Sequence, residues 1–127
     1  MYNLDPSYLF MCSKILLNLN KPKESLEYLK KIDENFLFLN EEEESESLNE
    51  KKESKFSFWI GNYYHISGLA YGLLSKNDTS IESRKKIQKI AIENLLKSNE
   101  FDSNNPLLLY HIALQYSEIR EVKKKNF

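Results

Sequence analysis

The stretch Phe101–Tyr116, FDSNNPLLLYHIALQY, combines a polar turn with a helical repeat of apolar residues. Its polar residues 102–105 supply turn and N-cap chemistry, and Pro106 follows where a first helical residue does not need its N–H. Apolar residues then recur at i, i+3, i+4 and i+7, the spacing of one helix face: Leu109, Ile112, Ala113 and Tyr116. The stretch therefore predicts the end of one helix, a short turn and the start of another.

The same stretch matches the tetratricopeptide template of roughly 34 residues, in which each repeat is a helix, a turn and a second helix. Two earlier segments, 9–16 and 64–71, carry comparable positions, although the template's closing proline is Ser103 here. Gly68 lies inside one of them, and a glycine in a helix interior costs about 1 kcal/mol relative to alanine, which indicates close approach of a neighbouring helix. We therefore expect an all-α fold, a tetratricopeptide-like α-solenoid of antiparallel helix pairs with about five helices.

Composition agrees with one helical domain. The chain has 127 residues, of which 41% are hydrophobic and 29% charged, with only three glycines and three prolines. So few turn-forming residues favour long helices over a many-turned β-protein. The net charge of −1 gives no electrostatic footprint for nucleic acid. No signal peptide and no apolar run of about 20 residues is found, and Cys12 has no second cysteine to pair with, so a cytoplasmic protein is expected.

The domain divides into four segments. Residues 6–35 form a first repeat, and residues 40–55 form an acidic insertion expected to be disordered, because it lacks the apolar residues needed to offset its ordering entropy. Residues 56–100 form a second repeat, longer than the template. Residues 104–124 form the first helix of an incomplete third repeat. The insertion is interpreted as a solvated connection, with docking on a basic partner or serine phosphorylation as alternatives.

The third repeat lacks its partner helix. Because each repeat of a solenoid buries its apolar face only against its neighbours, the last helix would leave a face uncovered. Three interpretations remain open: the chain is part of a longer protein, it self-associates, or the terminal helix caps the stack imperfectly. The first is favoured.

The sequence offers little catalytic chemistry. His65 and His111 are its two histidines, and neither has a His, Cys, Asp or Glu at ligand spacing beside it. Cys12 is expected to be a small core residue. No phosphate-binding loop, nucleophile elbow or paired-histidine zinc motif is found. We therefore expect no enzyme, no cofactor and no metal site.

The concave face of such a repeat stack is the expected protein-binding surface. A peptide-binding class of these repeats uses Lys and Asn side chains to clamp a partner's carboxylates. Here the candidate positions are mostly apolar and the full Lys/Asn set is absent, which argues against a chaperone co-factor. The candidate groove-facing residues are Phe10, Lys14, Leu17, Asn18, His65, Leu69, Tyr110 and Leu114.

Three segments together resemble the tetratricopeptide repeat protein 7 family: GLAYGLLSKND from Gly68, RKKIQKIAIENLL from Arg84, and DSNNPLLLYHIALQYSEIR from Asp102. That family has a similarly lengthened repeat. The upstream unit, PSYLFMCSKILLNLNKPKESLEY from Pro6, is similar to its preceding repeat. The resemblance covers most of the chain apart from the acidic insertion, although members of the family are much longer solenoids.

The resemblance implies a non-enzymatic scaffold. Family members bind the type III alpha phosphatidylinositol 4-kinase and connect it to a membrane-anchoring subunit at the plasma membrane, with hyccin as a further partner. A related plant branch, the no-pollen-germination proteins, is described as calmodulin-binding. The expected partners are thus proteins, with membrane association only through them, at the inner face of the plasma membrane. A general peptide- or protein-binding repeat module is the alternative.

Overall fold

The computed structural model describes residues 6–32 and 50–124, and within these ranges every regular element is a helix. The helices are α1 (Pro6–Asn18), α2 (Pro22–Ile32), α4 (Glu50–Lys76), α5 (Ile81–Phe101) and α6 (Pro106–Lys124). The all-α prediction is therefore confirmed. No helix in the described ranges combines the length and apolar character needed to cross a membrane.

Short polar turns with local hydrogen bonds separate α1 from α2, α4 from α5, and α5 from α6. After α1, Asn20 adopts a left-handed conformation (φ 59°), and the Lys21 N–H donates to the Leu16 carbonyl at 2.8 Å, which is a Schellman-type ending. Before α6, the side-chain oxygen Oδ1 of Asn105 accepts from the N–H groups of Leu107 and Leu108 at 3.1 and 3.2 Å. This N-cap satisfies donors that the first helical turn leaves without partners.

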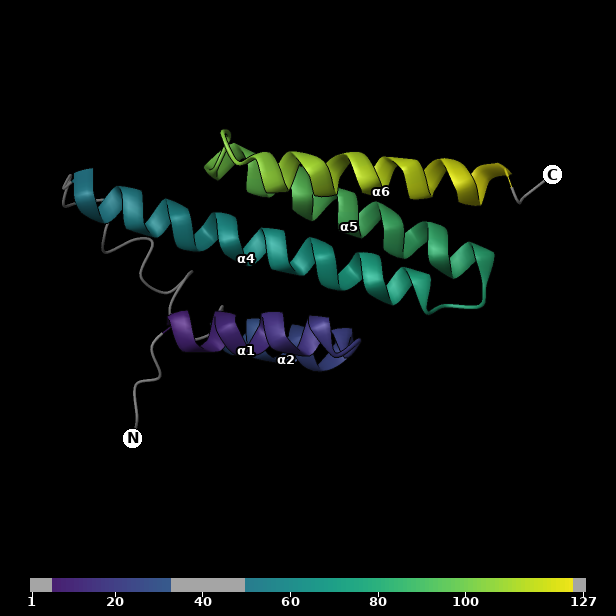
Figure 1. The fold of residues 1–127 in the computed structure, drawn as a ribbon, viewed down its shortest axis with the longest axis horizontal. Coiled ribbons are helices and arrows are strands. Elements are labelled where there is room, and N and C mark those ends of the chain that lie inside the picture. The colour runs from purple at the N-terminus through teal and green to yellow at the C-terminus, as the bar shows by residue number, and fades with distance from the viewer. Residues whose placement is uncertain (1–5, 33–49, 125–127) are drawn as a thin grey trace.

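Helix α4 is the centre of the molecule. It packs along α5, and its other side contacts α1 and α2, while α6 packs mainly on α5 (Figure 1). One apolar cluster joins α1, α2 and α4: Leu9, Phe10, Leu29, Ile32, Ile60 and Ile66. A second buried set lies at the α5 side of the molecule: Ala91, Ile92, Leu95 and Leu108.

Small residues let the paired helices approach closely. A Cβ atom added at Gly68 would lie 2.5 Å from Leu95 Cδ2 and 3.1 Å from the Ala91 carbonyl oxygen, so the predicted close approach is confirmed. In the first pair, the fully buried Ser25 donates its hydroxyl to the Ser13 carbonyl at 2.9 Å. Such contacts hold α2 against α1 and α5 against α4.

One predicted boundary and one core assignment need correction. Helix α4 begins at Glu50 rather than at residue 56, so residues 50–55 of the expected disordered insertion are helical. Glutamate and lysine are good helix formers, and these residues extend a helix that packing already stabilises. Residues 33–49, which hold the rest of the insertion, lie outside the described part of the chain. Cys12 is only half-buried, because the α1 surface that it shares is not fully covered.

The face that α6 buries also differs from the predicted one. Leu108 and Gln115 point inward, with 0% and 8% of their surfaces exposed, whereas Leu109 and Tyr116 are 50% and 51% exposed. The reason is that α6 contacts α5 and α4, which lie on the side of Leu108, and no other helix of the described residues packs on the side of Leu109. The apolar spacing of α6 predicted a helix correctly, but its template face is uncovered.

Candidate functional site

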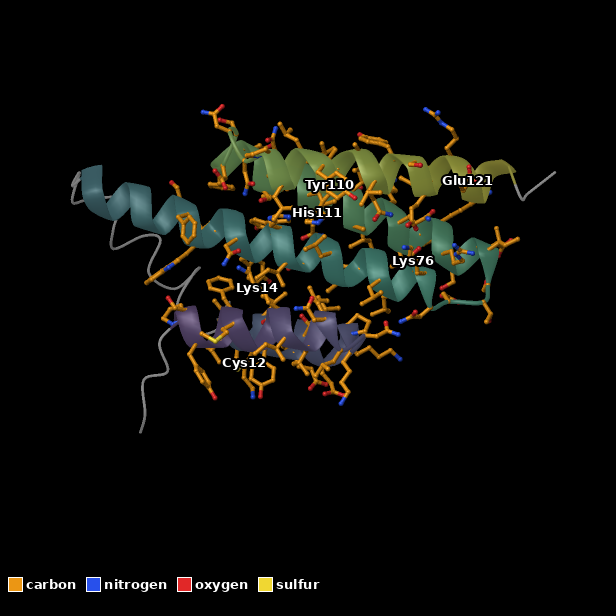
Figure 2. The ribbon with its side chains drawn as sticks, in the orientation of Figure 1. Cys12, Lys14, Lys76, Tyr110, His111 and Glu121 are labelled. Carbon is orange, nitrogen blue, oxygen red and sulfur yellow. The ribbon has the colours of Figure 1, made fainter. Side chains whose placement is uncertain are left out.

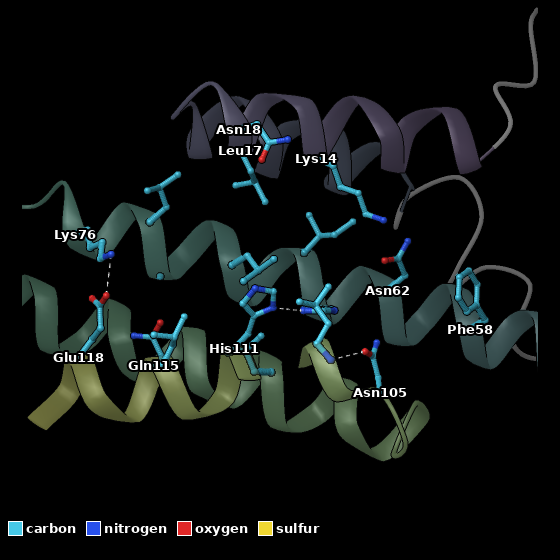
Figure 3. Close-up of a pocket in the computed structure, with 18 residues that line it drawn as sticks. Lys14, Leu17, Asn18, Phe58, Asn62, Lys76, Asn105, His111, Gln115 and Glu118 are labelled. Carbon is cyan, nitrogen blue, oxygen red and sulfur yellow. Dashed lines mark hydrogen bonds and ion pairs between the residues drawn. The ribbon is translucent and has the colours of Figure 1, made fainter. Parts of the chain in front are cut away.

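A groove of about 570 Å³ lies between α1, α4 and α6 (Figure 3). It is lined by six of the eight residues predicted to face a protein-binding groove: Lys14, Leu17, Asn18, His65, Leu69 and Leu114. These residues come from three helices that are not consecutive in the sequence. The fold thus brings most of the predicted set into one hollow.

The two remaining predicted residues lie elsewhere. Phe10 is 3% exposed and belongs to the apolar cluster between α1, α2 and α4. It precedes Lys14 by one helical turn, but α1 lies so close to α4 at that point that the ring is enclosed. Tyr110 is 59% exposed and is not part of the groove lining, because it points away from the helices on which α6 packs.

Several groove residues were missed by sequence analysis. On α6, Leu107 and Glu118 line the groove beside His111 and the predicted Leu114, so that these four residues lie at the spacing i, i+4, i+7 and i+11. That spacing marks one helix face and could have identified the set. Phe58, Asn62 and Leu73 of α4 also line the groove, and they share one helix face with the predicted His65 and Leu69, at the spacing i, i+4, i+7, i+11 and i+15.

The two histidines meet in this groove, although 46 positions separate them in the sequence. His65 Nε2 of α4 and His111 Nδ1 of α6 are 2.8 Å apart, so one neutral ring donates and the other accepts. Figure 3 shows this bond joining the two helices. The contact links α4 directly to α6, between which few other residues touch.

The electrostatic surroundings keep both rings neutral near pH 7. The pKa of His65 is lowered to about 4, chiefly because burial penalises the charged ring, then because His111 and Lys14 lie nearby, with Asp102 opposing the shift. Burial also lowers the pKa of His111. A neutral pair can share one hydrogen bond, whereas two charged rings would repel each other.

Other polar groups are spread along the groove. The Lys76 ammonium pairs with a Glu118 carboxylate oxygen at 2.9 Å. Lys14 points into the groove (Figure 3), and among the described side chains it has no carboxylate partner. Gln115 is 8% exposed, and its buried Nε2 has no hydrogen-bond partner in the described part of the molecule. The groove thus offers a mostly apolar surface with a cation and an unpaired amide donor.

Within residues 6–32 and 50–124, no three His, Cys, Asp or Glu side chains come together as a metal site would require. Figure 2 shows Cys12 on the opposite side of α1 from Lys14, and so away from the histidine pair.

Comparison of the chain with protein-family models, with curated proteins and with solved structures finds no significant match.

Proposed function

We propose that this chain is a non-enzymatic protein-binding module, a tetratricopeptide-like α-solenoid segment whose groove holds a segment of a partner protein. The observation that carries the proposal is the groove between α1, α4 and α6, with its apolar lining and the unpaired Lys14. Ligand sites in proteins are typically concave and mostly apolar, with a few polar groups that fix orientation. A partner segment with apolar side chains and hydrogen-bond acceptors fits this description.

The repeat assignment is supported by the two helix pairs. Ser13 of α1 and Gly68 of α4 occupy the same template position, and each lies against the following helix. In α2 and α5, the facing template positions are also small and fully buried, at Ser25 and Ala91. Equivalent small residues at equivalent crossings are expected when two units share one packing scheme.

The histidine pair is the part of the groove closest to a catalytic arrangement. We propose that it is structural, because the ring nitrogens bond to each other and both pKa values are lowered by burial. A general base that works near neutral pH would need a pKa close to 7. The His65 pKa of about 4 leaves it a weak base.

A narrower proposal concerns the identity of the partner. The resemblance of residues 68–120 to the lipid-kinase scaffold family suggests a phosphatidylinositol 4-kinase and its membrane-anchoring subunit, reached at the inner face of the plasma membrane. The length of the second helix pair, 27 residues in α4 and 21 in α5, is in keeping with the lengthened repeat of that family. A general peptide-binding module, including a calmodulin-binding one, is the alternative.

Affinity purification with groove variants tests both the general binding proposal and the narrower proposal about the partner. The chain would be tagged, expressed in the cells from which it comes, and purified under mild conditions beside Lys14→Glu and Leu114→Arg. Both positions are exposed, so the variants should fold. Glu93→Lys, an exposed change on α5 outside the groove lining, is the matched control.

The outcomes separate the alternatives. Proteins retained by the native chain and the control but lost from both groove variants would support the binding groove. A phosphatidylinositol 4-kinase among them would support the narrower proposal, and its absence would favour the general module. If both groove variants retain every partner, the groove is not the binding surface.

A further inference from the structure

The groove between α1, α4 and α6 is long and straight. Its lining runs along α4 from Phe58 to Lys76 and along α6 from Leu107 to Glu118, which correspond to about 27 and 16 Å at the rise of an α-helix. Figure 3 shows α1 and α6 on opposite sides of α4, with all three helices running in the same direction. The groove can therefore hold a rod-shaped segment about three helical turns long.

The walls of the groove offer few hydrogen bonds to the backbone of a bound segment. They are the sides of helices, whose own N–H and C=O groups are bonded within each helix. Asn105 is already engaged, since its Oδ1 caps α6 and its Nδ2 donates to Asp102 at 3.0 Å. The other amide side chains of the lining are Asn18, Asn62 and Gln115.

This shortage of polar groups favours a helical ligand over an extended one. An extended segment carries one free donor and one free acceptor per residue, and those on its inward side would be left unpaired against the groove. An α-helix bonds its own backbone internally and needs only side-chain contacts. The wall side chains suit it, because leucines line all three sides of the groove, and Leu107 and Leu114 are still 57% and 43% exposed.

The charges of the groove indicate one further feature of the ligand. Three of the lining side chains are ionised, and two of them, Lys76 and Glu118, pair with each other at 2.9 Å. Lys14 is the third, and it has no carboxylate partner among the described side chains. Its charge reaches α4, where it adds to burial and His111 in lowering the pKa of His65. A carboxylate placed beside Lys14 would complete this pairing.

We propose that the segment held by this groove is an amphipathic α-helix of a partner protein, with its apolar face against the leucines and an Asp or Glu beside Lys14. This inference rests on the proposed function, because it names the conformation and the charge of the segment that the same groove binds. Amphipathic helices are recognised in apolar grooves through residues spaced i, i+3 or i+4, and i+7.

A display library of random peptides, each about 16 residues or four helical turns long, tests the proposal. Peptides that bind the native chain are counter-selected on Leu114→Arg, so that only groove-dependent binders remain. We expect their apolar residues at i, i+3 or i+4, and i+7, with Asp or Glu at one fixed position. A proline in the middle of the best peptide should weaken binding more than tenfold relative to alanine there, because it breaks a helix.

A charge exchange tests the contact with Lys14. Replacing the acidic residue of the peptide by lysine should weaken binding to the native chain at least tenfold, and Lys14→Glu should restore most of that loss. Lys89→Glu, an exposed change on α5 outside the groove lining, is the matched control and should alter neither affinity. In NMR titrations the pKa of His65 should be higher with the acidic peptide than with its glutamine counterpart, because the carboxylate offsets the charge of Lys14.

This proposal and the proposed function fail in different ways. Groove-dependent peptides that tolerate the central proline, or that bind the native chain and Lys14→Glu equally well, would overturn the acidic helix and leave the groove as a binding site. If no peptide distinguishes the native chain from Leu114→Arg, the groove holds no peptide segment, and both proposals are overturned.

Discussion

Helices α4 and α6 have the same apolar spacing and opposite surroundings. In α4, Gly68 is buried beneath α5, and a Cβ atom there would lie 2.5 Å from Leu95 Cδ2. In α6, Ala113 occupies the corresponding position and is exposed. The spacing that makes each helix amphipathic is thus a property of the sequence, whereas burial depends on whether a second helix is present. The comparison thus separates the apolar spacing, which the sequence of each helix encodes, from burial, which requires a neighbouring helix.

The largest expected effect is on stability, and it appears when leucine is introduced at Gly68 and at Ala113 and the two variants are compared. Gly68→Leu should destabilise the fold by about 3 kcal/mol, because the new side chain must displace Leu95 or the backbone of Ala91. Ala113→Leu should change the free energy of unfolding by less than about 0.5 kcal/mol, as is usual for exposed sites. Urea unfolding followed by circular dichroism, at a concentration low enough to keep the chain monomeric, measures both.

Equal destabilisation by the two variants would contradict the contrast between α4 and α6. Gly61→Ala provides a control within α4, because its Cβ would make only an ordinary contact, 3.4 Å from Asp102 Cβ. There the gain in helix propensity should leave stability unchanged or slightly higher.

A smaller effect is expected from the bond that joins the two helices. The pKa of His65 is near 4 in the folded chain and about 6.5 when unfolded, so the unfolded state binds more protons below pH 6.5. The stabilising contribution of the neutral ring is therefore complete above pH 6.5 and is lost as the pH falls toward 4. A loss of about 1 to 2 kcal/mol is expected between pH 7 and pH 5.

His65→Asn tests the source of that loss. The variant should be less stable than the native chain at pH 7, because the His111 ring loses its partner, and its stability should fall less steeply between pH 7 and pH 5. Urea midpoints at the two pH values give the slopes. An unchanged slope would mean that the pH dependence of stability does not come from His65.

The sequence predicted local features of each helix better than the placement of the helices relative to one another. The turn at residues 102–105, the start at Pro106 and the close approach at Gly68 all depend on neighbouring residues or on one residue's size. The contact between His65 and His111 depends on how two distant helices cross, and no local pattern encodes it. Six of the predicted groove residues line the groove between α1, α4 and α6, whereas Phe10 lies in the core, because a single turn of α1 separates the groove from the core.

The face of α6 shows a further limit. Its sequence supports two apolar stripes, one through Leu108 and one through Leu109, and periodicity alone cannot choose between them. In the structure, the stripe through Leu108 faces inward, and Leu108 is completely buried. The template favoured Leu109 because it assumes a following helix. Among the described residues, no helix follows α6.

The smallest effect concerns how each helix begins. Asn105 caps α6 with two accepted bonds and donates a third to Asp102, whereas Ser80 caps α5 through one 3.4 Å bond from the Ser83 N–H. Helix α5 is also held along its length by α4, so its cap matters less than that of α6. Asn105→Ala should cost about 1 kcal/mol and Ser80→Ala about 0.5 kcal/mol.

Amide hydrogen exchange distinguishes a local effect from a global one. Asn105→Ala should accelerate exchange in the first turn of α6 more than in α5, because α6 is packed on fewer neighbours and opens separately. Ser80→Ala should leave α6 unchanged. If Asn105→Ala accelerates exchange equally in α4, α5 and α6, the helices open as one unit, and the weaker support of α6 has no consequence for its stability.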